Sequence, residues 1–152
     1  MTASAISLRP LTRHNLGAVC RLDAGDGGRQ VASNQRSMAQ AAVHAEAWPR
    51  AIYEGELPVG FLMLNDPTLC PDPETPEFFL WRLMVDRGHQ GRGIGRAALR
   101  LLVEHVRGRP GATRLMVSHV DGADATQRFY ESLGFVPTGE LDEDEHVMAL
   151  RL

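Results

Sequence analysis

The chain has 152 residues, of which 43% are hydrophobic and 23% are charged, with a formal net charge of −3. These values fit one domain over residues 1–152. The chain lacks the excess of basic residues that is typical of a nucleic-acid-binding protein. The sequence has no apolar run of the roughly 20 residues that span a membrane and no basic, hydrophobic leader, so we expect a cytoplasmic protein. Cys20 and Cys70 stand in unrelated contexts and predict neither a disulfide framework nor a metal site.

The N-terminal part of the sequence predicts a strand followed by two helices. Residues 4–9 are the strand candidate, and Thr12 is a good N-cap for the helix that follows. The glycine-rich stretch 24–29 predicts a flexible loop. A second helix is expected to begin near Asn34 or Ser37.

A hairpin and a loop are predicted next. Residues 50–53 and 59–64 are rich in apolar residues and flank a turn that contains Gly55, which is typical of two antiparallel strands. Residues 65–77 contain four prolines and predict a surface loop without regular structure.

The central stretch predicts a strand, a glycine-rich turn and a helix. Residues 78–85 are a near-continuous apolar run, as in a buried strand, and residues 86–93 are a polar turn. The helix that follows has an apolar face at helical spacing. The members of that predicted face are Ile94, Ala97, Ala98, Leu101, Leu102 and His105.

This central unit has the chemistry of an anion site. The first turn of a helix has backbone N–H groups without intrahelical partners, at the positive end of the helix dipole. Gly91, Gly93 and Gly95 leave these groups unobstructed, and Arg92 and Arg96 add positive charge beside them. The unit therefore predicts a nucleotide-bearing cofactor.

Two common nucleotide motifs do not fit the turn. The P-loop requires a lysine and a serine or threonine after its second glycine, and the run that starts at Gly88 lacks them. In the dinucleotide fingerprint G-x-G-x-x-G the third glycine follows two intervening residues, whereas here Gly95 comes one place early.

The C-terminal part of the sequence predicts a crossover and a hairpin. Residues 113–119 are a core strand, and residues 125–133 are a short helix that ends before Gly134. Strand, helix, strand and helix in this order favour a parallel crossover. Residues 135–141 and 146–150 predict a final hairpin around an acidic turn.

Two segments in this order carry a family resemblance. Gln90–Gly95 fits the Q/R-x-x-G-x-G/A signature of the GNAT superfamily of N-acetyltransferases, and FYESLGF at 129–135 fits its F/L-Y-x-x-x-G-F segment. The chain strongly resembles this superfamily over roughly residues 50–150. The resemblance implies an α/β fold, that is, a mixed α+β sheet of about six to seven strands flanked by about four helices, with a βαβα core that binds acetyl-CoA. The cofactor-binding residues that it implies are Leu83, Met84, Val85, Gln90, Gly91, Arg92, Gly93, Ile94, Gly95 and Arg96.

Tyr130 is the candidate general acid. Phe129 and Leu133 are four residues apart and are expected to face the core, whereas Tyr130 is rotated by about 100° toward a cleft. In direct acetyl transfer an amine attacks a thioester, and the departing thiolate takes a proton from an acid that is still protonated at neutral pH. A phenol with a pKa of about 10 meets that requirement. The alternative role for Tyr130 is a residue at the edge of the core with a hydrogen-bonded hydroxyl.

The base that deprotonates the amine is left open between Glu77, acting through a water, and His119. Arg82 lies inside an apolar strand, where an unpaired guanidinium is costly, so we expect it to form an ion pair. Many family members have an asparagine at the position of Ala123, where it contacts the pantetheine arm, and no such contact is assigned here. Asp121 or Asp124 is expected to cap the following helix instead.

The acceptor is a small-molecule amine in the leading interpretation. The central strand and stretches such as 48–53 look similar to bacterial spermine/spermidine N-acetyltransferases. A protein or antibiotic amine and a noncatalytic acetyl-CoA sensor are the alternatives. A homodimer is also left open, and neither nucleic acid nor a membrane is expected as a partner.

Overall fold

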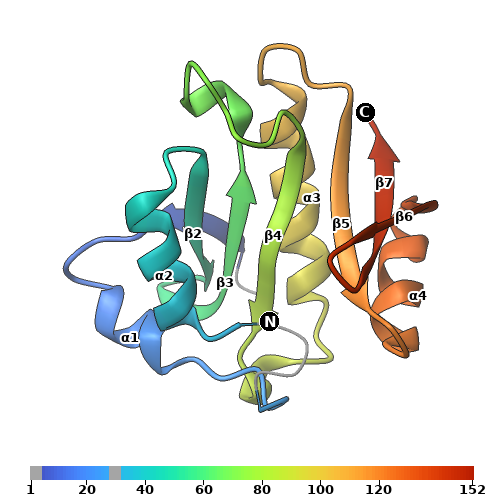
Figure 1. Cartoon of the computed structure of the whole chain (residues 1–152). Coiled ribbons are helices and arrows are strands. Elements are labelled where there is room, and N and C mark those ends of the chain that lie inside the picture. The colour runs from blue at the N-terminus through green and yellow to red at the C-terminus, as the bar shows by residue number, and fades with distance from the viewer. Residues whose placement is uncertain (1–4, 28–31) are drawn as a thin grey trace.

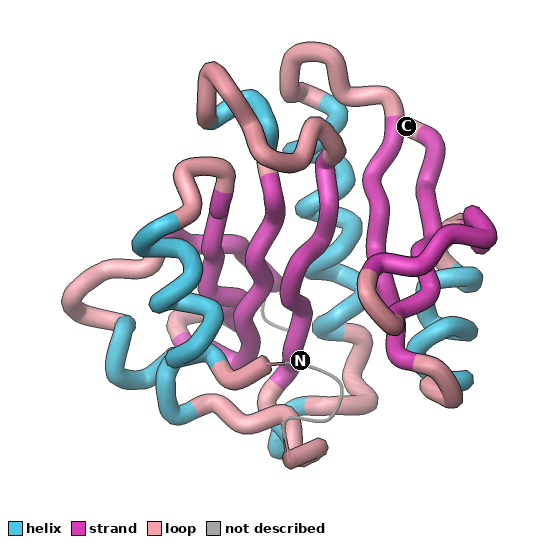
Figure 2. Tube along the Cα trace, in the orientation of Figure 1, coloured by secondary structure: helices cyan, strands magenta, loops and turns pink. Residues whose placement is uncertain are grey.

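A mixed sheet of seven strands forms the centre of the computed structural model, which describes residues 5–27 and 32–152. The strands lie in the order β1-β2-β3-β4-β5-β7-β6, with helices on both faces (Figures 1 and 2). The strands are β1 (Ile6–Pro10), β2 (Ala47–Glu54), β3 (Leu57–Asn65), β4 (Phe78–Val85), β5 (Arg114–Val120), β6 (Val136–Asp142) and β7 (Glu145–Arg151). The described α-helices are α1 (Leu16–Arg21), α2 (Asn34–Val43), α3 (Ile94–Arg107) and α4 (Asp124–Ser132), and the 3-10 helices η1 (Pro67–Leu69) and η2 (Arg87–His89) each make one turn. The predicted mixed sheet with about four helices is confirmed.

β4 and β5 are parallel neighbours that separate along their length. They pair only at Phe78 with Leu115 and at Phe79 with Met116 in the described residues, although the two strands have 8 and 7 residues. Figure 1 shows the two strands diverging, with α3 behind them. The predicted parallel crossover through α3 is therefore confirmed, and the carboxyl half of β4 has an edge that faces β5 without pairing to it.

The two faces of the sheet have separate apolar clusters. One cluster joins α3 to the sheet through residues such as Leu64, Leu80 and Leu102, and the other joins α1 and α2 to the sheet through Val19 and Met63. Apolar contact on both faces buries most of β3 and leaves β4 buried or half-buried, which explains their near-continuous hydrophobic sequence.

The buried face of α3 is rotated from the predicted one. The side chains that it buries are Ile94, Ala98, Leu99, Leu102, Val103 and Val106. Leu101, which belonged to the predicted face, is exposed. Apolar residues cover more than half of the helix circumference, so periodicity alone left two neighbouring stripes as candidates.

Local structure changes one predicted boundary, confirms a second and adds a short helix to a predicted loop. The Thr12 hydroxyl accepts from the N–H groups of His14 and Asn15 in a turn, so α1 begins later, at Leu16. Ser33 caps α2 by accepting from the N–H of Arg36, which confirms a start at Asn34. The loop at residues 65–77, predicted to lack regular structure, contains η1.

Some predicted features fall partly outside the described residues. They are the first residue of the 4–9 strand and the last two residues of the 24–29 loop. Within the described residues, no helix is long and apolar enough to cross a membrane, and no group of three or more His, Cys, Asp or Glu side chains is placed to hold a metal ion.

Candidate active site

A cleft of about 1400 Å³ follows the separation between β4 and β5. Both strands line it, together with α2, the glycine-rich turn, the first turn of α3, α4 and the β6–β7 hairpin. Of the residues predicted for the site, it brings together Glu77, Leu83, Met84, Val85, Gln90, Gly91, Gly93, Ile94, Gly95, Arg96, His119 and Tyr130. Arg92 is outside this lining.

The glycine-rich turn opens the first turn of α3 toward the cleft. Gly91 and Gly93 have φ angles of 75° and 78°, a left-handed conformation that favours glycine. A Cβ at either position would meet no heavy atom within 4 Å, so backbone conformation and not crowding requires glycine there. Gly93 is the N-cap and has no side chain to cover the N–H groups that follow. The turn is therefore shaped to accept an anion.

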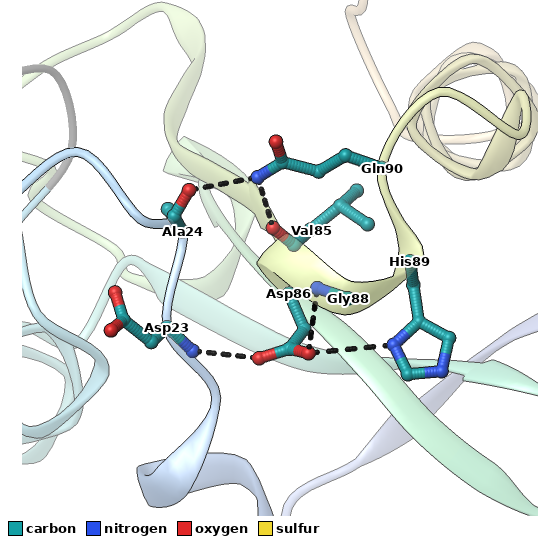
Figure 3. Close-up of polar contacts among 7 residues, drawn as sticks. All are labelled: Asp23, Ala24, Val85, Asp86, Gly88, His89 and Gln90. Carbon is teal, nitrogen blue, oxygen red and sulfur yellow. Dashed lines mark hydrogen bonds and ion pairs between the residues drawn. The ribbon is translucent and has the colours of Figure 1, made fainter.

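Gln90 joins the glycine-rich turn to the loop that follows α1. Its Nε2 donates to the carbonyl of Ala24 at 2.8 Å and to the carbonyl of Val85 at 2.9 Å (Figure 3). The side-chain nitrogen of the first residue in the signature is therefore bonded to protein carbonyls. A cofactor contact through Gln90 stays a prediction.

Asp86 makes a second tie between the same two segments. Its carboxylate accepts from the backbone N–H of Asp23 at 3.0 Å and of Gly88 at 3.2 Å, and it lies 3.4 Å from Nδ1 of His89 (Figure 3). The Asp23 carbonyl accepts in turn from the N–H of Arg87. The hydrogen bond from Asp23, followed by those from Gly88 and His89, lowers the pKa of Asp86 against the opposing effect of burial. The loop after α1 is thus held against the turn.

The two arginines of the turn differ in position. Arg92 pairs with Glu54 at 3.0 Å, on the outside of the cleft lining. Arg96 lines the cleft, donates to the Ser132 hydroxyl at 2.6 Å and lies over the Phe129 ring. Arg96 is therefore the arginine of this pair that can reach a phosphate inside the cleft without leaving an ion pair.

Tyr130 is part of the cleft lining and is 7% exposed. Its ring packs against Phe129 and Phe135 at centroid distances of 5.4 and 5.5 Å. Burial raises the pKa of the Tyr130 phenol well above its usual value, and the nearby charge of Glu145 raises it further. The side chain keeps its proton at neutral pH and lines the cleft.

The predicted orientation of α4 is wrong in one respect. Tyr130 is the buried residue of this helix, whereas Phe129 and Leu133 are only partly buried. The helix packs at the edge of the sheet, beside the cleft, so its deepest side chain faces both the core and the cleft. Tyr130 therefore packs against the core and also lines the cleft, and its role as the general acid stays a prediction.

The two candidate bases have different surroundings. The Glu77 carboxylate is bonded to the Arg114 guanidinium at 2.8 Å. His119 is 7% exposed and places Nδ1 3.1 Å from the Val120 carbonyl. Since a carbonyl only accepts, this contact is a hydrogen bond when Nδ1 carries the proton, which leaves a lone pair on Nε2. That tautomer suits a base, and the choice between the two residues stays a prediction.

The ion pair expected for Arg82 is absent from the described residues. Its Nη2 donates to Oε1 of Gln40 at 3.0 Å and its Nη1 to the Trp81 carbonyl at 2.8 Å. Burial, followed by the charge of Arg36, lowers the pKa of the guanidinium. An amide on α2 thus takes the place of the expected carboxylate, which a sequence pattern within β4 does not reveal.

The start of α4 also differs from expectation. Ala123 is the N-cap residue, and Asp124 is the first residue of the helix, where its charge complements the dipole. The Asp121 carboxylate is bonded to Nε2 of His146 at 3.1 Å. Ala123 therefore has only a methyl group at the position where many family members have an asparagine.

Sequence analysis missed several residues of the cleft wall on the α2 side. Arg36 and Gln40 come from α2, Ser118 from β5 and Glu145 from the start of β7. The Ser118 hydroxyl donates to the Glu145 carboxylate at 2.9 Å. Glu145 had been assigned to an acidic turn, and only the pairing of β5 with β7 places it on the sheet face that lines the cleft.

One cleft contains a helix start that suits an anion, the edge of β4 that does not pair with β5, and the phenol of Tyr130, which keeps its proton. This combination is typical of a group-transfer site with a nucleotide-bearing donor. The model of the acetyltransferase (GNAT) family matches residues 24–135. The chain belongs to this family, and the expected acetyl-CoA-dependent acetyltransferase is confirmed at the level of the family.

Individual relatives agree with that assignment. The chain is 33% identical over 102 residues to the spermine/spermidine N(1)-acetyltransferase of Bacillus subtilis, a match that covers 66% of each chain. Its fold resembles an acetyltransferase from Thermus thermophilus, with a TM-score of 0.75, 22% identity and 100% of both chains covered. It also resembles the aminoglycoside acetyltransferase AAC(6')-Ib in complex with coenzyme A, with a TM-score of 0.77 and 18% identity over 97% of this chain and 95% of that one.

Proposed function

We propose that the protein transfers the acetyl group of acetyl-CoA directly to a primary amine of a polyamine such as spermine or spermidine. The observation that carries the proposal is that the glycine-rich turn and Tyr130 open into one cleft whose charged residues are mainly acidic. The acidic residues of that lining are Asp26, Glu46, Glu74, Glu77, Glu140, Asp142, Glu143 and Glu145, and its arginines are Arg36, Arg82 and Arg96. A polycation is attracted to such a surface.

The donor half of the cleft fits acetyl-CoA, which supplies an activated acetyl thioester when it is bound. The N–H groups at the start of α3 and the Arg96 guanidinium suit its pyrophosphate. The strand edge at Leu83–Val85, which does not pair with β5, has backbone groups available for the amides of the pantetheine arm.

The acceptor half has residues suited to proton transfer. Tyr130 holds a proton on its hydroxyl, which a departing thiolate can take. His119, through Nε2, or Glu77, through a water, is the proposed acceptor of the amine proton. Neither cysteine is needed, because direct transfer requires no acyl-enzyme.

The name of the Bacillus subtilis relative supports a polyamine acceptor. The test is the release of CoA from acetyl-CoA in the presence of spermidine, spermine, n-propylamine, an aminoglycoside and a peptide with a free N-terminus. We expect the highest kcat/KM with the two polyamines, and a decrease with added salt because exposed charges are screened. A higher kcat/KM with the peptide or the aminoglycoside would show that the acceptor is not a polyamine. Acetyl-CoA binding without transfer to any amine would favour a sensor.

A further inference from the structure

Glu145 occupies a position in the cleft that the proposed mechanism leaves without a task. It is the first residue of β7 and pairs with Val120 of β5. Residues opposite each other across an antiparallel pair share one face of the sheet, as do alternate residues of a strand, so Ser118 lies on the same face. The Ser118 hydroxyl donates to Oε1 of Glu145 at 2.9 Å, and both side chains line the cleft.

The carboxylate of Glu145 is half-buried but is not matched by a cation at contact distance. Within the described residues, no Lys, Arg or His side chain lies within 4 Å of the Glu145 carboxylate. Glu54 and Glu77, in contrast, are each bonded to an arginine. A positive group that joined the Glu145 carboxylate would gain a charge-assisted hydrogen bond. The pairing of Glu145 with Val120 places it at the end of β5, in the cleft that Tyr130 and Arg82 also line.

The chemistry of the acceptor decides which positive group fits. A carboxylate against the reacting nitrogen would stabilise its protonated form and oppose its attack. A polyamine also has a second ammonium group that does not react, and binding that group does not have this cost. We propose that Glu145, fixed by Ser118, binds the non-reacting ammonium of the acceptor and thereby orients the reacting nitrogen toward the transfer point beside Tyr130.

This inference rests on the proposed function and makes Glu145 a positioning residue. Its test compares Glu145→Gln with Asp144→Asn, which removes the same charge one residue away, at an exposed turn position outside the described cleft lining. Loss of a charge-assisted contact is expected to raise the KM for spermidine about 10- to 100-fold. The KM for n-propylamine and the affinity for acetyl-CoA are expected to stay close to those of the wild type, because neither ligand has a non-reacting ammonium group.

Two further variants keep the test informative if Glu145→Gln is unstable. Glu145→Asp keeps the charge and is expected to recover part of the spermidine KM, and Ser118→Ala, which releases the carboxylate, is expected to raise it by a smaller factor. The inference is overturned if Glu145→Gln changes the KM no more than Asp144→Asn, or if it raises the KM of spermidine and n-propylamine equally. Absence of polyamine turnover by the wild-type chain would instead reject the proposed function, and the role of Glu145 with it.

Discussion

Gln90 donates a hydrogen bond to the carbonyl of Ala24 at 2.8 Å, although the two residues are 66 positions apart in the sequence. The first residue of the glycine signature thus joins the donor turn to the loop that follows α1. Ala24 and Gln90 both line the cleft, so this contact joins two parts of the cleft wall: the glycine-rich turn and the loop that follows α1.

The first prediction concerns that contact. Gln90→Glu keeps the size of the side chain but removes its N–H donors and sets a carboxylate against two carbonyls. We expect weaker acetyl-CoA binding in calorimetry and a loss of about 0.5–1.5 kcal/mol in the free energy of unfolding, because both hydrogen bonds are exposed to water. The matched control is Gln35→Glu, since Gln35 Nε2 donates to the Cys20 carbonyl at 2.9 Å outside the cleft lining. Equal acetyl-CoA affinities in the two variants would refute a link between this contact and the donor site.

The second prediction concerns the pH dependence of Asp86. Its hydrogen bonds lower its pKa in the folded protein below the unfolded value of 3.8. The stabilisation is therefore present above the unfolded pKa and is lost as the pH falls below it. We expect the free energy of unfolding, measured by urea titration from about pH 6 to about pH 3, to fall less steeply for Asp86→Asn than for the wild type. Asp144→Asn is the control, and an acid limb as steep in Asp86→Asn as in this control would contradict the assignment.

The third prediction separates the strain of a glycine position from its function. Gly93→Ala and Gly111→Ala each add a methyl group at a φ above 70°, with no heavy atom within 4 Å. Both should lose about 1–2 kcal/mol of stability because the left-handed conformation is strained for alanine. Only Gly93 is at the start of α3, so only Gly93→Ala is expected to weaken acetyl-CoA binding, by about 10-fold. If calorimetry gave Gly93→Ala the same acetyl-CoA affinity as Gly111→Ala, the anion site would lie elsewhere.

Local patterns in the sequence predicted most of the fold. The strand at residues 78–85 has the bounds of β4, because an apolar run between a proline-rich loop and a glycine-rich turn has sharp ends. The buried face of α3 was predicted less well, since its apolar stripe is wide and contacts from β1 and the sheet decide the rotation. Leu101 was assigned to the core for this reason.

The donor side of the cleft could be predicted from the sequence, whereas the acceptor side could be predicted only at Tyr130, Glu77 and His119. The glycines that shape the glycine-rich turn lie close together, at positions 91, 93 and 95, so one stretch of sequence contains the site. Glu145, Arg82 and Gln40 come from three elements, and their positions depend on strand pairing and on how α2 packs. The absence of an ion pair at Arg82 and the unmatched carboxylate of Glu145, both within the part of the chain that the structure describes, follow from those long-range contacts.

The most direct test of the account is the rate of acetyl transfer by Tyr130→Phe in a single turnover. The substitution keeps the ring and removes only the hydroxyl group, so acetyl-CoA affinity should change little. Loss of a positioned acid is expected to lower the transfer rate by about 10²- to 10⁴-fold. Tyr53→Phe, at the other tyrosine, is the matched control, because Tyr53 is 8% exposed and lies in the apolar cluster on the α1 and α2 face. A transfer rate for folded Tyr130→Phe equal to that of Tyr53→Phe would contradict the assignment of Tyr130 as the acid.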